Sequence, residues 1–551
     1  MNKILRLLLT LSILLFSGID KVFSQEWEVF NYNDDYNDSV ISRYKEVLEL
    51  SNGNILVSSF TQHKNNIGEF CSGVPSLVLI SHDGIEIGKN DYFKPGMCVL
   101  SYPYVFENNG EMYMLNSYNP DHDPYSDNHF KNYNEPPTES IIGLYKLDEM
   151  LNVHKRYEHF IPIDTFEQRN ETWYQTPYLS GCINIYSAFE DNGIITGSYT
   201  KEVSYSEVPR GNDSVFFFKM DFEGNLLLSK GYEALINENR SNCFRQQMVK
   251  GDNGYIVYYR YSPLPSYHSR VEYYDNDFNY IDTKHIRMPE HDVNKDRSFR
   301  DHCVIRSNNN TTYVSTISRS LKNPLMDDDI RLYEFNDDLN NSGEVLPVIR
   351  YIERGTPELD RPSYRSLDMT DDGNIFFAYS LNVGSVGHGD SWAVIEMLDA
   401  NLDTISTLFY DIGEQMHTTV LCIKATDDDG LLLITKSKDL KNTNNRWTTV
   451  TKFPASAFNP DNIEEAHANN LHLAVAYPNP GGDVMNIRTG LRNAVLTVYD
   501  LQGRKIHEQE ITDDVTSVDA SKWQSGTYIW KLGIRNEELG IKEVESGKWV
   551  K

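Results

Sequence analysis

The sequence predicts an all-β protein: a seven-bladed β-propeller followed by a small C-terminal β-sandwich. Two observations carry this prediction, a pair of hairpins repeated through most of the chain and a change of pattern close to its end. Asn, Asp and Gly crowd short turns between segments rich in β-branched and aromatic residues, which is typical of strands joined by tight turns. The 35 tyrosines and 24 phenylalanines favour strands over helices.

The first hairpin of the repeat occurs seven times. Each copy is a polar turn, in most cases Asn-Gly or Asp-Gly, followed by a strand-like segment, as in LSNGNILVSS (Leu50–Ser59). Asn-Gly and Asp-Gly supply the positive φ angles that tight hairpins need. Successive copies lie 57 to 83 residues apart, counted between Gly53, Gly110, Gly193, Gly254, Thr311, Gly373 and Gly430.

A second hairpin follows within each of the first six periods, and Ser76–Phe93 is the clearest example. Each period then holds four strands, which is typical of propeller blades. The seventh period has a third strand, Trp447–Phe453, but no fourth, whereas an unpaired segment, Glu26–Tyr32, precedes the first period. Pairing these two segments would seal a ring and remove two exposed edges. An open β-solenoid or a pair of sandwiches is the alternative, but a solenoid has shorter and more uniform periods.

Residues 1–24 are expected to be a signal peptide. Lys3 and Arg6 precede the apolar run Leu7–Phe16, which is too short to span a bilayer, and Ser24 offers a small residue for cleavage. An uncleaved membrane anchor is the alternative. Removal of the signal takes away three basic residues and one acidic residue, which moves the net charge from −29 to −31. So acidic a chain repels nucleic acid and anionic membranes, and no later segment could form a transmembrane helix, so we expect neither partner.

In a propeller, the second-to-third loops and the crossings between blades lie on one face, opposite the tight turns. Here those connections are the long, irregular ones, and we expect a ligand to bind there. Three crossings share Arg, a spacer, an aromatic residue and Arg, just before the first strands of blades four, five and six. First strands line the central channel, so these side chains would ring its mouth and bind a carboxylate, sulfate or sugar acid: Arg240, Arg245, Arg297, Arg300, Arg361 and Arg365. The commoner alternative is pairing with the nearby acids Asp296, Asp301, Glu358 and Asp360.

One period is extended by the segment NPDHDPYSDNHF (Asn119–Phe130). Its carboxylates suit Ca²⁺, and the candidate ligands are Asp121, Asp123 and Asp127, with His122 and His129 better suited to a transition metal. The segment lacks the Gly and the closing Glu of an EF-hand loop, so a solvated polar loop is the alternative. We expect no other cofactor.

Catalytic patterns are sparse. The sequence has no G-x-S-x-G, H-E-x-x-H or P-loop motif, and its six cysteines show no C-x-x-C spacing. We therefore expect a binding protein for a carbohydrate or protein ligand rather than an enzyme. A surface glycan-degrading hydrolase or lyase, with its site at the channel mouth, is the alternative; convergence there of two carboxylates, or of His, Tyr and Arg, would favour it.

The pattern changes after Phe453. Residues 25–453 would form the propeller, and the small, polar residues 454–472 a linker. The tail, residues 473–551, alternates apolar residues between Gly turns, as a small β-sandwich does. It carries in order Y-P-N-P, YD-x-x-G-R, G-x-Y and a basic end. On these motifs the tail resembles the type A C-terminal sorting domain of the type IX secretion system of Bacteroidetes, through Tyr477, Pro478, Asn479, Pro480, Gly503, Gly526, Tyr528 and Lys551.

One position departs from the family pattern, because Trp549 stands where Phe or Val is usual. The resemblance implies export across the outer membrane, recognition of the folded tail by the secretion machinery, and usually cleavage of the tail. The cargo is then released or attached to surface lipopolysaccharide. The sequence therefore predicts a secreted or cell-surface protein.

Overall fold

The protein is described by a computed structural model from residue 27 to residue 551. The segments it leaves undescribed, besides 1–26, are 32–39, 64–73, 93–102, 119–138, 163–182, 202–213, 233–245, 260–268, 287–296, 308–310, 321–327, 337–344, 347, 355–360, 382–390, 411–415, 440–445, 459–470, 473, 478, 480, 490, 492–493, 514 and 537–539. The all-β prediction is confirmed, since every regular element in the described part is a strand except a 3₁₀ turn, η1 (Ala455–Phe458). No helix among these residues is long and apolar enough to cross a bilayer.

Before the tail, the described part of the chain forms seven sheets, each built on four antiparallel strands. Sheets 1 and 2 are β2 (Val40–Glu49), β3 (Ile55–His63), β4 (Val74–Ile80), β5 (Glu86–Asp91), and β6 (Tyr104–Asn108), β7 (Glu111–Tyr118), β8 (Glu139–Leu147), β9 (Val153–Pro162). Sheets 3 and 4 are β10 (Ile183–Asp191), β11 (Ile194–Lys201), β12 (Ser214–Asp221), β13 (Leu226–Tyr232), and β14 (Gln246–Gly251), β15 (Gly254–Tyr259), β16 (Ser269–Asp275), β17 (Tyr280–Ile286).

The remaining three follow the same plan. Sheets 5 and 6 are β18 (Arg297–Arg306), β19 (Thr311–Ser320), β20 (Asp328–Asn336), β22 (Val348–Arg354), and β23 (Arg361–Met369), β24 (Ile375–Leu381), β25 (Trp392–Leu398), β26 (Thr404–Tyr410). Sheet 7 combines β27 (Met416–Ala425), β28 (Leu431–Asp439) and β29 (Arg446–Phe453) with β1 (Trp27–Asn31). Two sheets gain a short fifth strand: β21 (Val345–Leu346) on β17 and β30 (Leu471–His472) on β26.

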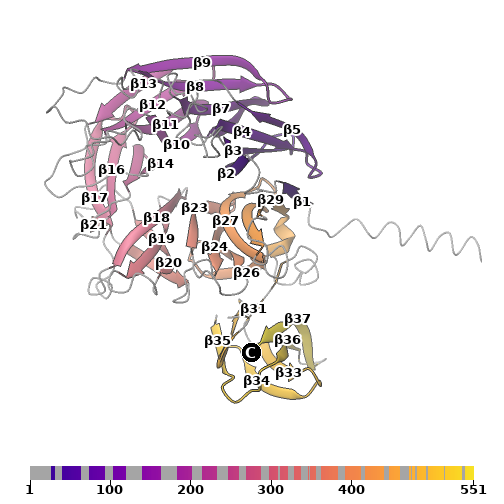
Figure 1. Cartoon of the computed structure of the whole chain (residues 1–551). Coiled ribbons are helices and arrows are strands. Elements are labelled where there is room, and N and C mark those ends of the chain that lie inside the picture. Colours follow the sequence, from indigo (N-terminus) through magenta and orange to yellow (C-terminus); the bar gives the residue numbers. More distant parts are fainter. Residues whose placement is uncertain are drawn as a thin grey trace, which may run out of the picture.

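The two ends of the seven-sheet region meet in sheet 7. β1 pairs antiparallel with β29, from Trp27 opposite Lys452 to Asn31 opposite Thr448, as the unpaired strands in the sequence predicted. The first strands of successive sheets also contact one another in chain order, and β27 contacts β2. Figure 1 shows this order, with indigo and magenta sheets followed by orange ones around a common centre.

The described turns between third and fourth strands, in sheets 1 to 4 and 6, share one geometry. In sheet 4, a carboxylate oxygen of Asp275 accepts hydrogen bonds from the backbone N–H groups of Asp277 (2.8 Å) and Asn279 (2.7 Å). These two hydrogen bonds hold Phe278 at a φ of 57°, where a non-glycine residue is otherwise uncommon. The turn carbonyl also binds the neighbouring sheet, because the Tyr232 hydroxyl donates to the Phe278 oxygen. The turns therefore join adjacent sheets as well as closing hairpins.

Aromatic side chains fill the space between sheets. Between sheets 3 and 4, the Phe217 ring lies 4.6 Å from that of Tyr274 and 5.1 Å from that of Phe278, measured between centroids. All three are buried. Such rings bury large apolar areas and gain further from tilted contacts, which accounts for the abundance of Tyr and Phe in the composition.

The tail forms two further sheets. One holds β31 (Ala474–Tyr477), β32 (Val484–Thr489) and β35 (Val515–Asp519); the other holds β33 (Ala494–Asp500), β34 (Lys505–Glu510), β36 (Thr527–Asn536) and β37 (Gly540–Val550). Met485 and Ile487 of the first sheet share a fully buried core with Leu496 and Leu532 of the second.

Regular structure also occurs at both ends of residues 454–472, the predicted linker. Phe458 in η1 is buried, with its ring 4.8 Å from that of Phe376 in sheet 6. At the other end, β30 pairs with β26. These short segments attach to sheet 6, on both sides of the undescribed residues 459–470.

Candidate functional site

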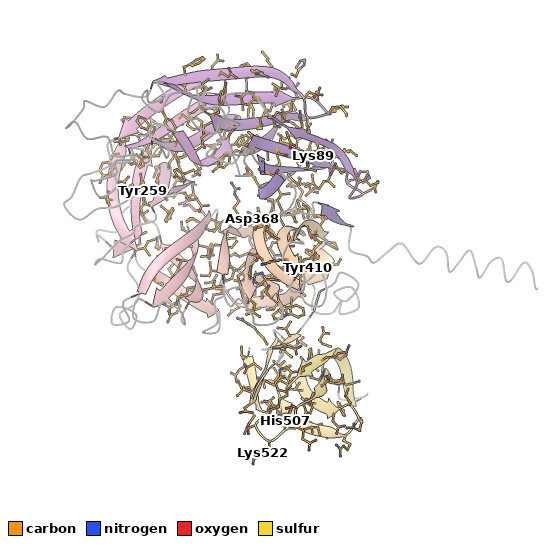
Figure 2. The ribbon with its side chains drawn as sticks, in the orientation of Figure 1. Lys89, Tyr259, Asp368, Tyr410, His507 and Lys522 are labelled. Carbon is orange, nitrogen blue, oxygen red and sulfur yellow. The ribbon has the colours of Figure 1, made fainter. Side chains whose placement is uncertain are left out.

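Arg365 reaches across the centre of the seven-sheet region. Its Nη1 donates to Glu46 Oε1 at 2.7 Å, and its guanidinium carbon lies 5.5 Å from the centroid of the Tyr104 ring. These residues lie on the first strands of sheets 6, 1 and 2, so the contact bypasses sheet 7. We call Arg365, Glu46 and Tyr104 the axial cluster. Figure 2 labels Asp368, three residues further along β23, near the centre of the sheets.

Local irregularities in the first strands place these side chains. In β23, residues 363–366 lie opposite the single residue Ala378, because the register moves from Pro362–Tyr379 to Leu367–Phe377. Such a bulge re-aims side chains, and Pro362 favours it because proline has no N–H for the ladder. In β2, the register also shifts between Tyr44 and Glu46. Both partners of the central ion pair therefore lie at bulges.

Hydrogen bonds join successive first strands around the axial cluster. The Tyr104 hydroxyl donates to the Tyr186 carbonyl at 2.6 Å, linking sheets 2 and 3. Between sheets 6 and 7, Asp368 Oδ2 accepts from the Ala425 backbone N–H at 2.7 Å and pairs with Lys424 Nζ at 2.9 Å. The Tyr104 hydroxyl and the Asp368 carboxylate are thus engaged within the protein.

The electrostatics favour a charged Arg365 and a neutral Tyr104. Burial lowers the pKa of Arg365, but the Glu46 carboxylate and then Tyr104 raise it, and the net shift is upward. Burial raises the pKa of Tyr104 well above its usual value despite the opposing Arg365 charge. Glu46 Oε2 is buried without a hydrogen-bond partner in the described structure. The Arg365–Glu46 pair therefore acts first as a cross-link between sheets.

Two buried thiols flank Arg365 from the first strands of sheets 5 and 7. Burial raises the pKa of the Cys422 thiol to about 12 and also raises that of Cys303. Both are free and 2% exposed. Because the thiolate is the reactive form, we expect neither to react with iodoacetamide at pH 8 in the folded protein.

Peptide mass spectrometry after alkylation, with and without urea, tests this expectation. Urea should make both cysteines reactive. Rapid modification of Cys303 or Cys422 in the native protein would contradict their burial beside Arg365.

The other predicted anion-binding arginines are placed only in part. Arg297 and Arg300 lie in β18, and Arg361 begins β23, so with Arg365 four of the six lie on first strands near the long connections. The side chains of Arg297, Arg300 and Arg361 are outside the described residues. Arg240 and Arg245, and the candidate calcium ligands Asp121, Asp123 and Asp127, lie in undescribed segments. The described residues contain no group of three or more metal-ligating side chains. The anion site and the calcium site remain predictions.

The sequence did not predict Glu46 as the partner of Arg365. The expected partners were acids close in sequence, but Glu46 is 319 residues away. No local pattern marks Glu46 or Tyr104, because their position depends on the order of the sheets and on the bulges.

In the tail, the Y-P-N-P-G-G motif holds the last strand. Asn479 Oδ1 accepts from the Val550 backbone N–H at 3.0 Å, and its Nδ2 donates to the Lys548 carbonyl at 3.0 Å. The Gly481 N–H donates to the Val550 carbonyl at 2.7 Å. A Cβ at Gly481 would lie 2.4 Å from the Trp549 ring, so the indole occupies the space that this glycine leaves open.

The final residue is fixed by several bonds. Lys551 Nζ donates to the carbonyls of Ala520 (2.6 Å) and Trp523 (3.0 Å) and pairs with Asp483 at 3.1 Å. Its backbone exchanges two hydrogen bonds with Gly526. The motif residues Gly526 and Lys551, distant in sequence from Asn479, are therefore brought to the same end of the tail.

The remaining motif residues complete this end. The Tyr528 ring lies 4.8 Å from that of Trp523 and 6.1 Å from that of Trp549, and its hydroxyl donates to the Gln524 carbonyl. Gly503 has a φ of 76° in a turn where Asp500 accepts from two backbone N–H groups. Tyr477 ends β31, while Pro478 and Pro480 are outside the described residues.

The fold and the tail together define an all-β protein with a folded C-terminal domain that carries the sorting motifs. Residues 475–544 match the secretion system C-terminal sorting domain family. This domain marks proteins exported by the type IX secretion system, and the protein is exported to the cell surface or out of the cell.

The solved structures that match this chain include three whose matches cover most of it. The crystal structure of the polysaccharide lyase Uly1 is 8% identical, with a TM-score of 0.42, covering 75% of this chain and 90% of that one. A protein of unknown function from Dyadobacter fermentans is 12% identical (TM-score 0.36; 77% and 98% covered), and the NanB sialidase of Streptococcus pneumoniae is 9% identical (0.37; 78% and 70%). No curated protein sequence matches this chain. At these TM-scores the likenesses carry no inference about function.

Proposed function

We propose that residues 25–453 form a closed seven-bladed β-propeller that binds a carbohydrate or protein ligand through its loop face. In this proposal, residues 454–472 connect the propeller to the sorting domain, residues 473–551. The main support is the contact order of the first strands, from β2 through β6, β10, β14, β18, β23 and β27 back to β2. A ring of seven sheets explains why Arg365 of sheet 6 meets Glu46 of sheet 1 at the axis.

The two ends of the sheets differ in a way that favours one face for binding. At the tight-turn end, ion pairs join neighbouring sheets: Lys250 to Asp191 at 2.7 Å and Lys452 to Glu49 at 3.1 Å. The opposite end carries the long connections, such as 119–138 and 202–213. Variable loops on a rigid scaffold are where binding residues usually lie. Arg300 and Arg361 would then face an anionic ligand from the first strands, and residues 121–127 could hold Ca²⁺.

An array of glycans and of outer-membrane or host surface proteins tests binding by the purified full chain. We expect saturable binding to at least one acidic glycan or protein, reduced at least tenfold by Arg300→Ala together with Arg361→Ala. No binding across both arrays would contradict the proposal.

The axial cluster is the observation that favours the alternative, a glycan-degrading hydrolase or lyase, because Arg, Tyr and a carboxylate converge there.

We expect Arg365→Met to lower the free energy of unfolding by about 2–3 kcal/mol, since it leaves Glu46 unpaired in a partly buried site. Urea titration measures this loss. Lys146→Met, which leaves the exposed Glu111 carboxylate without its ion-pair partner in contact with solvent, is the control and should cost under about 1 kcal/mol.

Product release from polysaccharides separates the two functions. Wild-type activity that is lost in Glu46→Gln, with the fold retained, would establish the enzyme. Absence of activity together with the expected stability loss would leave the cluster a structural cross-link.

A further inference from the structure

The tail is attached to sheet 6 before its own sandwich begins. β30 pairs with the last residues of β26, with Tyr410 opposite Leu471 and Phe409 opposite His472. β31 follows after a single residue and contacts β26. The chain therefore enters the tail directly from the edge of sheet 6.

One face of the three-stranded sheet in the tail is buried against sheet 6. Ala474, Ala476 and Met485 share a buried cluster with the sandwich residues Leu496 and Leu532, and this cluster also reaches Tyr410 of sheet 6. Because side chains alternate along a strand, Val475, Arg488 and Val515 point the other way. Val475 lies opposite Arg488, and Arg488 opposite Val515, so the three form a row across β31, β32 and β35. We call them the docking row.

The docking row is covered although it faces away from the sandwich core. Val475 is 1% exposed and Arg488 is 5% exposed. Val475 belongs to the same buried cluster as Tyr379, Val394 and Phe409 of sheet 6, and Val515 packs against that cluster. The outer face of the small sheet is thus in contact with the seven-sheet region.

Arg488 supplies the polar part of the contact. Its guanidinium carbon lies 5.6 Å from the centroid of the Tyr379 ring, and the Tyr379 hydroxyl donates to Glu396 Oε1 at 2.8 Å. Tyr379 and Glu396 are also buried. A desolvated guanidinium over a tyrosine ring, next to a buried carboxylate, gives a contact that is specific in position as well as favourable.

The contact lies at the end of sheet 6 from which the long connections leave. Tyr379 is two residues from the end of β24, and Tyr410 is the last residue of β26. Figure 1 places the tail beside β26, and Figure 2 labels His507 and Lys522 on the part of the tail that points away from the sheets.

We propose that the sorting domain is docked on its own cargo. The docking row and β30 hold the three-stranded sheet of the tail against the loop end of sheet 6. The seven-sheet region and the sorting domain therefore form one structural unit. The partner of this surface is therefore sheet 6 of the same chain, and the opposite side of the tail is the side open to other proteins.

Hydrogen exchange measured by mass spectrometry on the full chain tests the docking. We expect Arg488→Ala to speed exchange about tenfold in segments 404–410 and 471–477, the size expected for a desolvated cation–π contact. Lys522→Ala is the matched control, because Lys522 is an exposed cation of the same domain on the side that points away, and exchange should stay at the wild-type rate.

A second variant excludes simple unfolding of the tail. His472→Pro lies outside the sandwich and disrupts the β30 ladder, so it should raise exchange in 404–410 while leaving segments 494–500 and 527–534 protected. If Arg488→Ala loosens the sandwich as well, His472→Pro decides the outcome. Wild-type exchange in 404–410 in His472→Pro, and in Arg488→Ala with a protected sandwich, would overturn the docking.

Discussion

Deletion of residues 473–551 is expected to remove essentially all of the protein from the cell surface and the medium and to leave it in the periplasm. The folded tail carries the sorting motifs, and its last residue is bonded to Ala520, Trp523 and Gly526. Without the tail, only the signal peptide expected at residues 1–24 would remain, and such a signal would direct passage across the inner membrane alone. Cell fractionation with immunoblotting measures the distribution.

The control for this deletion is the solubility of the truncated chain in the periplasmic fraction. The deletion leaves β30 and all seven sheets intact, so the seven-sheet region should stay folded. Normal amounts of truncated protein outside the cell would contradict the role of the tail in export.

Trp549→Ala is expected to destabilise the tail by about 3–5 kcal/mol, the usual cost of truncating a buried Trp. Trp549 is fully buried, packs edge-on against Trp523, and fills the space above Gly481. A domain of this size has a free energy of unfolding of the same order. Most of the sorting domain should therefore be unfolded, and export should fall at least tenfold.

Urea titration followed by tail-specific fluorescence gives the stability, and fractionation gives the export. Val550→Ala is the control, because the neighbouring side chain is 37% exposed and contributes little to the core. Export at the wild-type level from a tail shown to be unfolded would contradict recognition of the folded domain.

The departure of Trp549 from the family pattern has a structural explanation. The large indole fits because residue 481 is a glycine, and a Cβ there would collide with the ring. The Y-P-N-P-G-G motif thus does more than begin a domain. Asn479 and Gly481 bind the strand that carries the basic end. The first and last sorting motifs of the tail therefore depend on each other.

Local features of the fold were predictable from the sequence because their causes are local. Asn-Gly and Asp-Gly turns mark the hairpins, and the unpaired segments at Glu26–Tyr32 and Trp447–Phe453 predicted the β1–β29 pairing. The repeat of two hairpins in each period predicted four strands in each sheet, because hairpin turns are local features. The fifth strands β21 and β30 were not predicted, because a strand of two residues is too short to show an alternating pattern.

The central contacts were not predictable in this way. Arg365 was singled out, but its partner Glu46 depends on bulges that no single strand reveals. Arg488 likewise occupies a position that alternation assigns to solvent, and only the packing of β31–β32–β35 on sheet 6 buries it. Long-range contacts between sheets leave little trace in a local pattern.

The most direct test of the account is to map where a bound ligand protects the full chain, using hydroxyl-radical footprinting with a ligand found on the array. The account predicts protection in the connections 119–138, 202–213 and 382–390, on one face of the ring. Protection confined to the tight turns at Asp221–Asn225 and Asp275–Asn279 would contradict binding through the loop face.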